Sequence, residues 1–312
     1  INQTLILEST SYPGTTYELF VKKLSKKFDI GKNFFIGFSS ERINPGFNEN
    51  KISEVPKVVS GYTKKCLNKI ANFYKTFFKK IVKAKSLEVA EFSKLLENIY
   101  RSVNIGFINE MKFIADKMNL DIFEIIKVAK TKPFGFRPFH PGPGIGGHCI
   151  PIDPHYLYWK ATKFGIKANF IRLSAFTNQK VIKFIKLKIL NQLKKQKLNK
   201  QKSKILLLGM SYKQNIDDLR ESASISLLSE LLKENIKNID WSDPHISNRI
   251  KLEEFNYEKK GIVLNSKNLR LFDLVILMTD HKKFNYDMIL KNSKLIIDCR
   301  GKFETSNKVI RG

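Results

Sequence analysis

The stretch GPGIGGHCIPIDP, residues 142–154, constrains the fold more than any other part of the chain. It holds four glycines and three prolines. Because glycine weakens regular elements and proline removes a backbone donor, such a run is expected neither inside a helix nor in a central strand. The stretch therefore predicts a rigid loop, and this loop carries a single thiol, that of Cys149.

A thiol in a rigid loop, with the carboxylate of Asp153 four residues further on, is a candidate covalent nucleophile. The alternative is a buried, inert cysteine, which is what we expect of Cys66 on a helix and Cys299 at a strand end. The three cysteines lie far apart without CxxC spacing. This argues against a disulfide framework and against a metal site, and it favours a cytoplasmic location.

The net charge of +27 in 312 residues raises the question of nucleic-acid binding. The lysines are spread along the whole chain, and no nucleic-acid motif accompanies them. The densest run, residues 186–204, is typical of a solvated helix end leading into a linker. No apolar run approaches the roughly 20 residues that cross a bilayer. The first residues have no basic n-region and no small-residue cleavage site, so we expect no signal peptide. We expect no membrane association, and specific nucleic-acid binding is the least favoured alternative.

The first two thirds of the chain predict a partial α/β domain followed by long helices. We expect Thr15 or Thr16 to cap the first helix and Asp121 to cap a later one. Apolar residues along the helix after residue 86 (Val89, Phe92, Leu95, Leu96, Ile99 and Val103) predict one buried face. Strands are expected at 4–10, at the start of 33–46, where the strand runs into a loop, and at 56–62. Helices are expected at 15–28, 64–78, 86–118, 119–131, 154–165 and 169–196.

From residue 203 onward, strands and helices alternate, which predicts a second α/β unit with a parallel sheet. Ligands of such sheets bind beyond the carboxyl ends of the strands. Strands are expected at 204–212, 238–244, 272–281 and 293–301, with a helix at 222–236. The strand ends carry Tyr212, Lys213, Asp243, Thr279, Asp280 and Arg300.

Two further segments carry candidate site residues. Along the helix after residue 86, Glu91, Lys94, Asn98 and Arg101 recur on one stripe, which is either a solvated face or a site where Lys94 and Asn98 hold a water or an oxyanion. Residues 209–222, GMSYKQNIDDLRES, follow a strand and precede a helix, where phosphates bind. No Walker loop is present, and the GPGIGG run does not follow a strand.

These motifs together resemble one family, the nucleotide-sugar 6-dehydrogenases (the UDP-glucose/GDP-mannose dehydrogenase family). The resemblance rests on LESTSYPGTT, SSERINPG, AEFSKLLEN, KPFGFRPFHPGPGIGGHCIPIDPHYL, LLLGMSYKQNIDDLRESAS and DCRG in that order. It is greatest to the branch acting on UDP-N-acetylglucosamine and UDP-N-acetylmannosamine. The resemblance implies a Rossmann-like NAD-binding part at 1–82, a helical dimerisation domain at 83–202 and a Rossmann-like UDP-sugar-binding domain at 203–312.

The resemblance also implies roles for individual residues. Cys149 would be the nucleophile that forms a thiohemiacetal and then a thioester, and Lys94, Asp153 and Asn98 would act on the hydrolytic water and the oxyanion. Glu41 and Thr10 match active-site positions, Thr10 beside the nicotinamide, and Arg220 would contact NAD phosphates. Arg101 and Glu110 match motif positions without an assigned role. The substrate would contact Lys213 through its diphosphate, together with Phe139, Pro141, Gly142, Gly144, Gly146 and Gly147.

One departure from the family concerns the cofactor NAD. Family members begin with a strand and a GxGxxG loop, and about a hundred residues of that domain have no counterpart here. We therefore expect an N-terminally shortened chain that binds NAD poorly. The alternatives are a UDP-glucose 6-dehydrogenase and a non-catalytic UDP-sugar-binding or dimerising protein. The apolar stripes of the long helices predict a homodimer.

Overall fold

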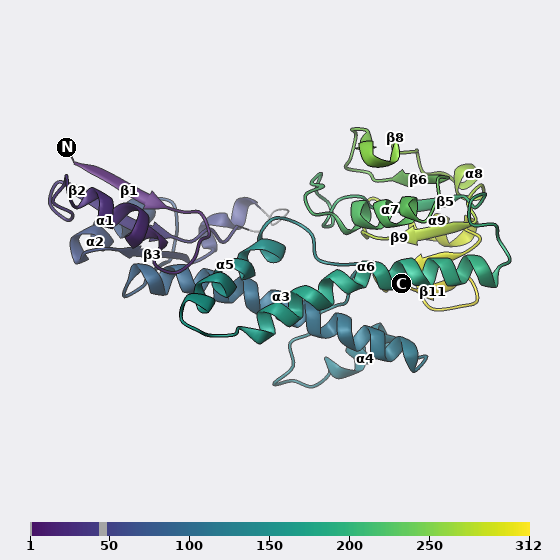
Figure 1. The fold of residues 1–312 in the computed structure, drawn as a ribbon, viewed down its shortest axis with the longest axis horizontal. Coiled ribbons are helices and arrows are strands. Elements are labelled where there is room, and N and C mark those ends of the chain that lie inside the picture. Colours follow the sequence, from purple (N-terminus) through teal and green to yellow (C-terminus); the bar gives the residue numbers. More distant parts are fainter. Residues whose placement is uncertain (1, 44–48) are drawn as a thin grey trace. The chain divides into compact units, whose positions relative to one another are not determined.

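The computed structural model describes residues 2–43 and 49–312 and divides into two compact units. Unit 1 comprises residues 1–101 and 152–171, and unit 2 comprises residues 102–151 and 172–312. Each unit contains its own sheet, and long helices follow the first sheet in the sequence (Figure 1). The expected α/β class, with a central helical segment and a C-terminal parallel sheet, is confirmed.

The sheet of unit 1 has the order β1-β2-β3-β4. The β1–β2 and β3–β4 pairs are parallel, whereas β2 and β3 are antiparallel, which the sequence pattern did not predict. Apolar side chains of the sheet pack on η1, α1 and the start of α3 on one face and on α2 on the other. The elements are β1 Gln3–Leu7, η1 Thr16–Val21, α1 Lys22–Leu24, β2 Phe34–Ser39, η2 Glu49–Glu54, β3 Lys57–Gly61, α2 Lys64–Tyr74 and β4 Ile81–Lys83.

Four helices follow: α3 Leu87–Lys117, α4 Ile122–Ala129, α5 Cys149–Lys163 and α6 Asn169–Lys195. Asp121 caps α4 as predicted, because its carboxylate accepts the Phe123 N–H at 2.9 Å. The single apolar face expected on α3 is wrong. Leu95 and Ile99 are buried, but Val89, Phe92 and Leu96 are 54%, 43% and 57% exposed. These three side chains form an uncovered apolar strip on α3.

Unit 2 contains a five-stranded, fully parallel sheet of order β11-β10-β9-β5-β6. Helices cover both faces, as a parallel sheet requires: α6 and α7 pack on one and α8 and α9 on the other. The elements are β5 Ile205–Leu208, α7 Ala223–Lys233, β6 Ile239–Ser242, β7 Ile250–Leu252, η3 Glu253–Phe255, β8 Tyr257–Lys259, α8 Ser266–Leu269, β9 Leu274–Leu277, α9 Tyr286–Asn292, β10 Ile296–Asp298 and β11 Val309–Arg311.

The strand order places β5 at the centre of this sheet, between β6 and β9. The chain leaves β5 toward β6 on one side, and the later strands are added on the other side. In open parallel sheets, ligands bind outside the carboxyl ends at such a reversal of strand order. The segment after β5, which includes Lys213, therefore begins at the favoured position for a ligand.

Two local expectations are wrong. The helix expected at 15–28 is a π-helical stretch with a short α-helix, and no threonine side chain caps it. Thr15 Oγ1 donates to the Tyr12 carbonyl, and Thr16 Oγ1 donates to Glu91. Helix α5 begins at Cys149 and not near Pro154, so the end of the proline-rich stretch is helical. Pro151 is tolerated because backbone N–H groups of a first turn have no helical partner.

Candidate functional site

Cys149 is exposed and begins α5, directly after the glycine-rich loop. The free N–H groups and the dipole of a helix N-terminus favour a thiolate over a thiol at such a position. Within unit 2, the Arg220 guanidinium is close enough to Cys149 to interact with it electrostatically. The pKa of Arg220 is raised foremost by its hydrogen bond with Asp218, and the Cys149 thiolate adds to this effect. The structure thus places an exposed thiol at a helix N-terminus.

The other two cysteines differ from Cys149. Cys66 and Cys299 are buried, as expected from the sequence. Burial raises the pKa of Cys299 to about 11, which keeps it a thiol at neutral pH. Its neighbour Lys112 is also buried, and the loss of hydration lowers the pKa of that ammonium to about 8. The burial of Lys112 could not be predicted, because this lysine lies within an otherwise ordinary helical pattern.

The glycine-rich loop packs on the protein itself, which explains why glycine is needed at two positions. A Cβ on Gly146 would lie 2.6 Å from Tyr212 Cβ and 2.7 Å from the Glu221 carbonyl oxygen. Gly147 has φ +84°, and its N–H donates to the Arg220 carbonyl at 2.9 Å. The loop and residues 209–222 thus form one continuous surface in unit 2.

The start of the loop is anchored on two helices of unit 2. The Gly142 N–H donates to Asn109 Oδ1 at 3.1 Å, and Asn109 Nδ2 donates to Asn178 Oδ1 at 2.9 Å. Phe139 packs in the apolar cluster formed by α3 and α4. Pro141 and Gly142 are buried, and Gly144 is half-buried. The segment is therefore fixed at both ends by contacts within the unit.

A cavity of about 870 Å³ opens beside this loop. Arg300 and Asp280, at the ends of β10 and β9, line it together with Gln214 and Pro141. Its other lining residues are Asp121, Phe123, Glu124, Lys127, Lys130, His140, Gly301, Lys302, Phe303, Glu304, Thr305 and Arg311. The volume lies within the range of ligand pockets. The lining carries both cations and carboxylates, and Arg311 is paired with Asp121 at 2.7 Å.

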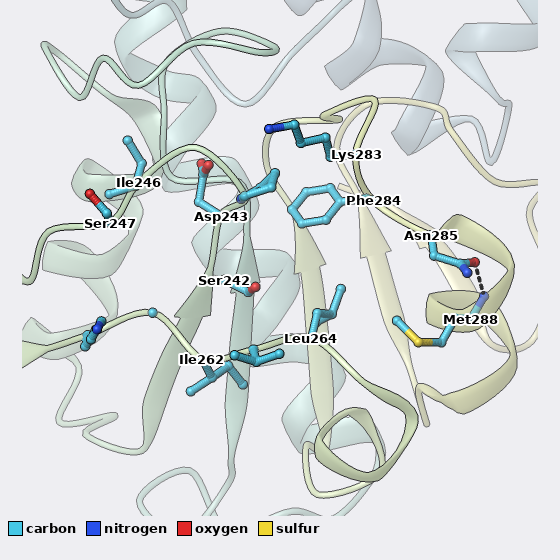
Figure 2. A pocket seen from close by; sticks show the side chains of 14 residues that line it. Ser242, Asp243, Ile246, Ser247, Ile262, Leu264, Lys283, Phe284, Asn285 and Met288 are labelled. Atoms are coloured by element: carbon cyan, nitrogen blue, oxygen red, sulfur yellow. Dashed lines mark hydrogen bonds between the residues drawn. The ribbon is translucent and has the colours of Figure 1, made fainter.

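Asp243, at the end of β6, lines a second pocket of about 430 Å³ (Figure 2). The walls of this pocket are largely apolar and include Ile262, Leu264 and Phe284. In dinucleotide-binding domains an acidic residue after the second strand binds a ribose. Here both oxygens of the Asp243 carboxylate already accept protein hydrogen bonds. The carboxylate therefore serves as an internal anchor.

In unit 1, Glu91 is buried and caps the N-terminal end of η1. Its carboxylate accepts the Gly14 N–H at 2.6 Å, the Thr16 N–H at 2.8 Å and the Thr16 hydroxyl at 2.6 Å. Burial raises the pKa of Glu91, and these hydrogen bonds offset the effect only in part. Glu91 was a member of the polar stripe on α3, and its interpretation as part of a solvated face is wrong for this position.

Asn98 and Asp153 meet within unit 1. Asn98 Nδ2 donates to Asp153 Oδ2, and both side chains are buried. Lys94 is half-buried one turn earlier on α3, and Arg101 is exposed. Two of the residues to which the resemblance gives a role at the water and the oxyanion are thus in direct contact.

The remaining predicted residues of unit 1 lie after the strands. Thr10 is half-buried beyond β1. Glu41 is exposed beyond β2, and its carboxylate accepts the Ile43 N–H and lies 3.6 Å from Lys57 Nζ. Lys57 also pairs with Glu8 at 3.0 Å. The end of the SSERINPG motif, residues 44–46, lies outside the described residues.

In unit 2, Lys213 lies in the segment that joins β5 to α7, after Ser211 and before Arg220 in the sequence. Lys213 is half-buried, and its carbonyl accepts the Ser211 hydroxyl at 2.8 Å. Arg220 forms a salt bridge with Asp218 at 2.6 Å and is 63% exposed. Sequence reasoning gave no role to Glu91, Asp243, Arg300 or His281. Asp243 and Arg300 were noticed as strand ends, and His281 carried no signal.

No helix among residues 2–43 and 49–312 is long and apolar enough to cross a membrane. The same residues contain no group of three or more histidine, cysteine or carboxylate side chains that is able to hold a metal ion. The fold and the site together define an α/β protein with a parallel five-stranded sheet and an exposed cysteine that begins a helix.

The chain belongs to the UDP-glucose/GDP-mannose dehydrogenase family. Residues 88–180 match the central domain of this family, and residues 206–305 match its UDP-binding domain. The chain is 35% identical to Protein CapL of Staphylococcus aureus over 95% of its own length and 70% of that protein. It is 34% identical to a UDP-N-acetyl-D-glucosamine 6-dehydrogenase of Pseudomonas aeruginosa over 90% of its own length and 65% of that protein.

Solved structures agree with this assignment. A UDP-D-ManNAc dehydrogenase from Pyrococcus horikoshii superimposes with a TM-score of 0.84 at 27% identity, covering 96% of this chain and 69% of that one. The Staphylococcus aureus UDP-N-acetyl-mannosamine dehydrogenase Cap5O gives a TM-score of 0.78 at 28% identity, covering 99% and 71%. The chain therefore spans about two thirds of the length of its relatives, 65% in the Pseudomonas example.

Proposed function

We propose that this protein oxidises the C6 alcohol of a UDP-N-acetylhexosamine, UDP-N-acetylglucosamine or UDP-N-acetylmannosamine, to the uronic acid in the cytoplasm. The product would serve surface polysaccharide synthesis. The observation that carries the proposal is the exposed Cys149 at the start of α5, directly after the glycine-rich loop. Relatives named as N-acetylhexosamine dehydrogenases support the substrate class.

The reaction consists of two oxidations and one hydrolysis. Loss of a hydride and a proton converts the alcohol to an aldehyde. Cys149 Sγ then bonds to the aldehyde carbon, and the oxygen takes a proton to give a thiohemiacetal. Loss of a second hydride and a proton gives a thioester, which water cleaves to the carboxylate and the free thiol. NAD, when bound, supplies the hydride acceptor for both oxidations. A thiolate suits this chemistry because it adds readily and forms a hydrolysable acyl bond.

The other catalytic roles are proposed from the resemblance, and one contact in unit 1 supports them. Asp153 accepts a hydrogen bond from Asn98 and is buried, so its carboxylate has a fixed direction from which to orient the hydrolytic water. The Lys94 ammonium stabilises negative charge on the oxygen, and the Asn98 amide assists it. Thr10 and Glu41 complete the proposed set from positions beyond β1 and β2.

Substrate binding is proposed for unit 2. Lys213 follows the central strand of a sheet that matches the UDP-binding domain, and its ammonium is assigned to the diphosphate. The loop from Phe139 to Gly147 is assigned to the uridine and the sugar. The cavity of about 870 Å³ beside this loop has the size for a sugar nucleotide.

NAD is proposed as the cofactor because of the family, and the described residues do not form a complete NAD site. Thr10 would contact the nicotinamide, and the exposed Arg220 would contact phosphates after release from Asp218. Within the described part of unit 1, no GxGxxG loop joins a strand to a helix. The residues present therefore account for only part of a dinucleotide site, and the pyrophosphate cradle is not among them.

The experiment is NADH formation by the 312-residue chain with UDP-N-acetylglucosamine and UDP-N-acetylmannosamine. Cys149→Ala removes the nucleophile and should lower uronic acid formation by roughly three orders of magnitude or more. Cys66→Ala is the matched control, because that buried thiol lies on α2 and should be dispensable. Equal uronic acid formation by wild type and Cys149→Ala contradicts the assigned nucleophile.

Two other functions are distinguished by the same assays. A UDP-glucose 6-dehydrogenase would form NADH with UDP-glucose in preference to the N-acetylated sugars. A non-catalytic UDP-sugar-binding protein would bind UDP in calorimetry but form no NADH. Binding of random DNA in preference to UDP at physiological salt would favour the charge-based alternative.

A homodimer is part of the proposal. The uncovered apolar strip on α3 exposes large side chains that monomers rarely leave in a contiguous patch. A second copy of the chain, bound through the same helix by two-fold symmetry, would cover it. Sedimentation should give a dimer, and Leu96→Glu should shift it toward the monomer.

A further inference from the structure

The segment after β5, residues 209–215, carries Lys213 but forms no helix or strand. Such a segment needs partners for its backbone groups, because buried N–H groups without an acceptor are costly. A buried pair, Asp243 and His281, provides these partners. The side chains of both residues are completely inaccessible to solvent, and they lie 3.0 Å apart.

Asp243 holds the beginning of the segment. Its Oδ2 accepts the Met210 N–H at 2.6 Å and the Ser211 N–H at 3.0 Å. Its Oδ1 accepts the His245 N–H at 2.8 Å, which fixes the carboxylate at the end of β6. The direction of β5 beyond its last residue is therefore set from the neighbouring strand.

His281 holds the end of the segment. Its Nδ1 accepts the Asn215 N–H at 3.0 Å, so the ring proton of the neutral histidine is on Nε2. That Nε2 lies 3.0 Å from Asp243 Oδ2 and 3.2 Å from Ser211 Oγ. One imidazole therefore connects Asp243, which holds the first residues of the segment, to Asn215, which follows Lys213 by two positions.

The ring itself has little freedom. The Tyr286 hydroxyl donates to the His281 carbonyl at 2.7 Å, and the Phe284 ring packs edge-on at 5.4 Å between centroids. Asn215 is also constrained. Its φ is +61°, and its side-chain Oδ1 accepts the Lys282 N–H at 2.9 Å. The segment is thus fixed on both sides of Lys213 by residues that follow β6 and β9.

We propose that His281 is a positioning residue for the sugar-nucleotide site, acting through Lys213. This inference rests on the proposed function, in which the Lys213 ammonium binds the substrate diphosphate. The ring accepts the Asn215 N–H and so fixes the backbone there. Because Asn215 is two residues from Lys213, this restricts the position of the Lys213 Cα, from which the side chain extends. Loss of the acceptor at Nδ1 removes one of the two anchors of Asn215 and loosens the end of the segment. This weakens diphosphate binding, because Lys213 is then less ordered before the ligand binds.

The test is a matched pair of variants that separate the two nitrogens. In His281→Asn the side-chain oxygen takes the place of Nδ1 and keeps the acceptor for Asn215. In His281→Gln the terminal amide reaches the place of Nε2 and keeps the donor to Asp243, but no acceptor for Asn215 is left. By calorimetry with UDP, we expect His281→Gln to weaken binding about tenfold, whereas His281→Asn retains affinity within about threefold.

The coupling to Lys213 is measured by a double-mutant cycle. In a Lys213→Ala background, the His281→Gln penalty should disappear, because there is no ammonium left to position. In turnover, the expected change is a raised KM with kcat changed much less. Tyr257→Phe is the stability control. It removes a buried hydrogen bond to the Ile239 carbonyl elsewhere in the unit and should leave UDP affinity unchanged.

Three outcomes decide the matter. A His281→Gln penalty that is absent in the Lys213→Ala background supports the inference. Equal UDP affinity of both variants and wild type, or a penalty that persists without Lys213, overturns the inference while leaving the proposed function intact. Absence of any UDP binding by the wild-type chain overturns the proposed function, and this inference with it.

Discussion

Glu91 in unit 1 and Asp243 in unit 2 are both buried carboxylates that accept backbone N–H groups from a segment far away in the sequence. Glu91 holds the turn that leads from β1 into η1, beyond Thr10. Asp243 holds the segment after β5, which carries Lys213. In each unit, a carboxylate on one element fixes the backbone near proposed site residues on another.

The two carboxylates differ in their ionisation. Burial raises the pKa of Glu91, and its donors, two backbone N–H groups and one hydroxyl, do not compensate. Burial also opposes ionisation of Asp243, yet the hydrogen bonds from His281 and from the His245 and Ser211 N–H groups hold its pKa below the usual value. The hydrogen-bond donors around a buried carboxylate, and not burial alone, therefore decide whether its ionised or its protonated form is favoured.

The largest expected effect is at Asp243. Asp243→Asn replaces one acceptor oxygen by an NH₂ group that faces N–H donors. We expect it to lower the free energy of local opening of residues 209–215 by about 3 kcal/mol, since the carboxylate accepts from several buried groups at once. Hydrogen exchange of peptides covering these residues measures the change in unit 2 itself, which matters because a chain of two units need not unfold in one step.

The matched control lies on the same strand. Asp240 is half-buried on β6 and pairs with Lys259, so Asp240→Asn makes the same chemical change outside the segment. It should alter exchange of residues 209–215 by less than about 0.5 kcal/mol. Equal effects of the two variants on exchange would show that the hydrogen bonds of Asp243 do not hold residues 209–215 in place.

Local pattern was enough to predict most of the regular elements. The apolar runs that became β1, β2, β3, β5 and β9 are bounded by turn residues, and α3 and α6 have helical periodicity over many turns. The alternation after residue 203 predicted the parallel sheet, because a parallel pair requires a crossover between its strands. The short strand β11 was missed, since three residues do not make a pattern.

What the sequence could not predict depends on contacts between distant residues. The cap of η1 comes from Glu91, 75 positions after Thr16, so only a local threonine was considered for that role. Gly146 and Gly147 were assigned to the substrate through the resemblance alone, and the packing of Tyr212 against both could not be predicted from local sequence. His281 gave no signal because its role depends on Asn215 and Asp243, which lie in two other segments. The motifs identified the loop and Cys149 more directly, because their composition is unusual.

A smaller effect is expected at Glu91. Glu91→Gln keeps one acceptor oxygen and presents an NH₂ group to either the Gly14 N–H or the Thr16 donors. The predicted loss is about 1–2 kcal/mol in the opening free energy of residues 10–20, read by hydrogen exchange. We expect less than at Asp243, because the environment of Glu91 already disfavours its charged form. A loss of opening free energy at Glu91 that equals or exceeds the loss at Asp243 would contradict the stronger anchoring inferred for Asp243.

The smallest expected effect is the pH dependence of the stability that Asp243 and Glu91 contribute. The folded pKa of Asp243 is lowered, so its stabilising contribution is present above the unfolded pKa of about 3.9 and is lost as pH falls through the folded value. The folded pKa of Glu91 is raised, so its contribution is present below the unfolded pKa of about 4.3 and is lost as pH rises through the folded value.

The two substitutions should therefore respond to acid in opposite directions. Between neutral pH and the lowest pH at which the chain stays folded, the cost of Asp243→Asn should shrink as pH falls, and the cost of Glu91→Gln should grow. Exchange of residues 209–215 and 10–20, corrected for the intrinsic dependence of exchange on pH, gives both slopes in one experiment. Slopes of the same sign would mean that burial governs both carboxylates, and that the histidine beside Asp243 does not set its charge.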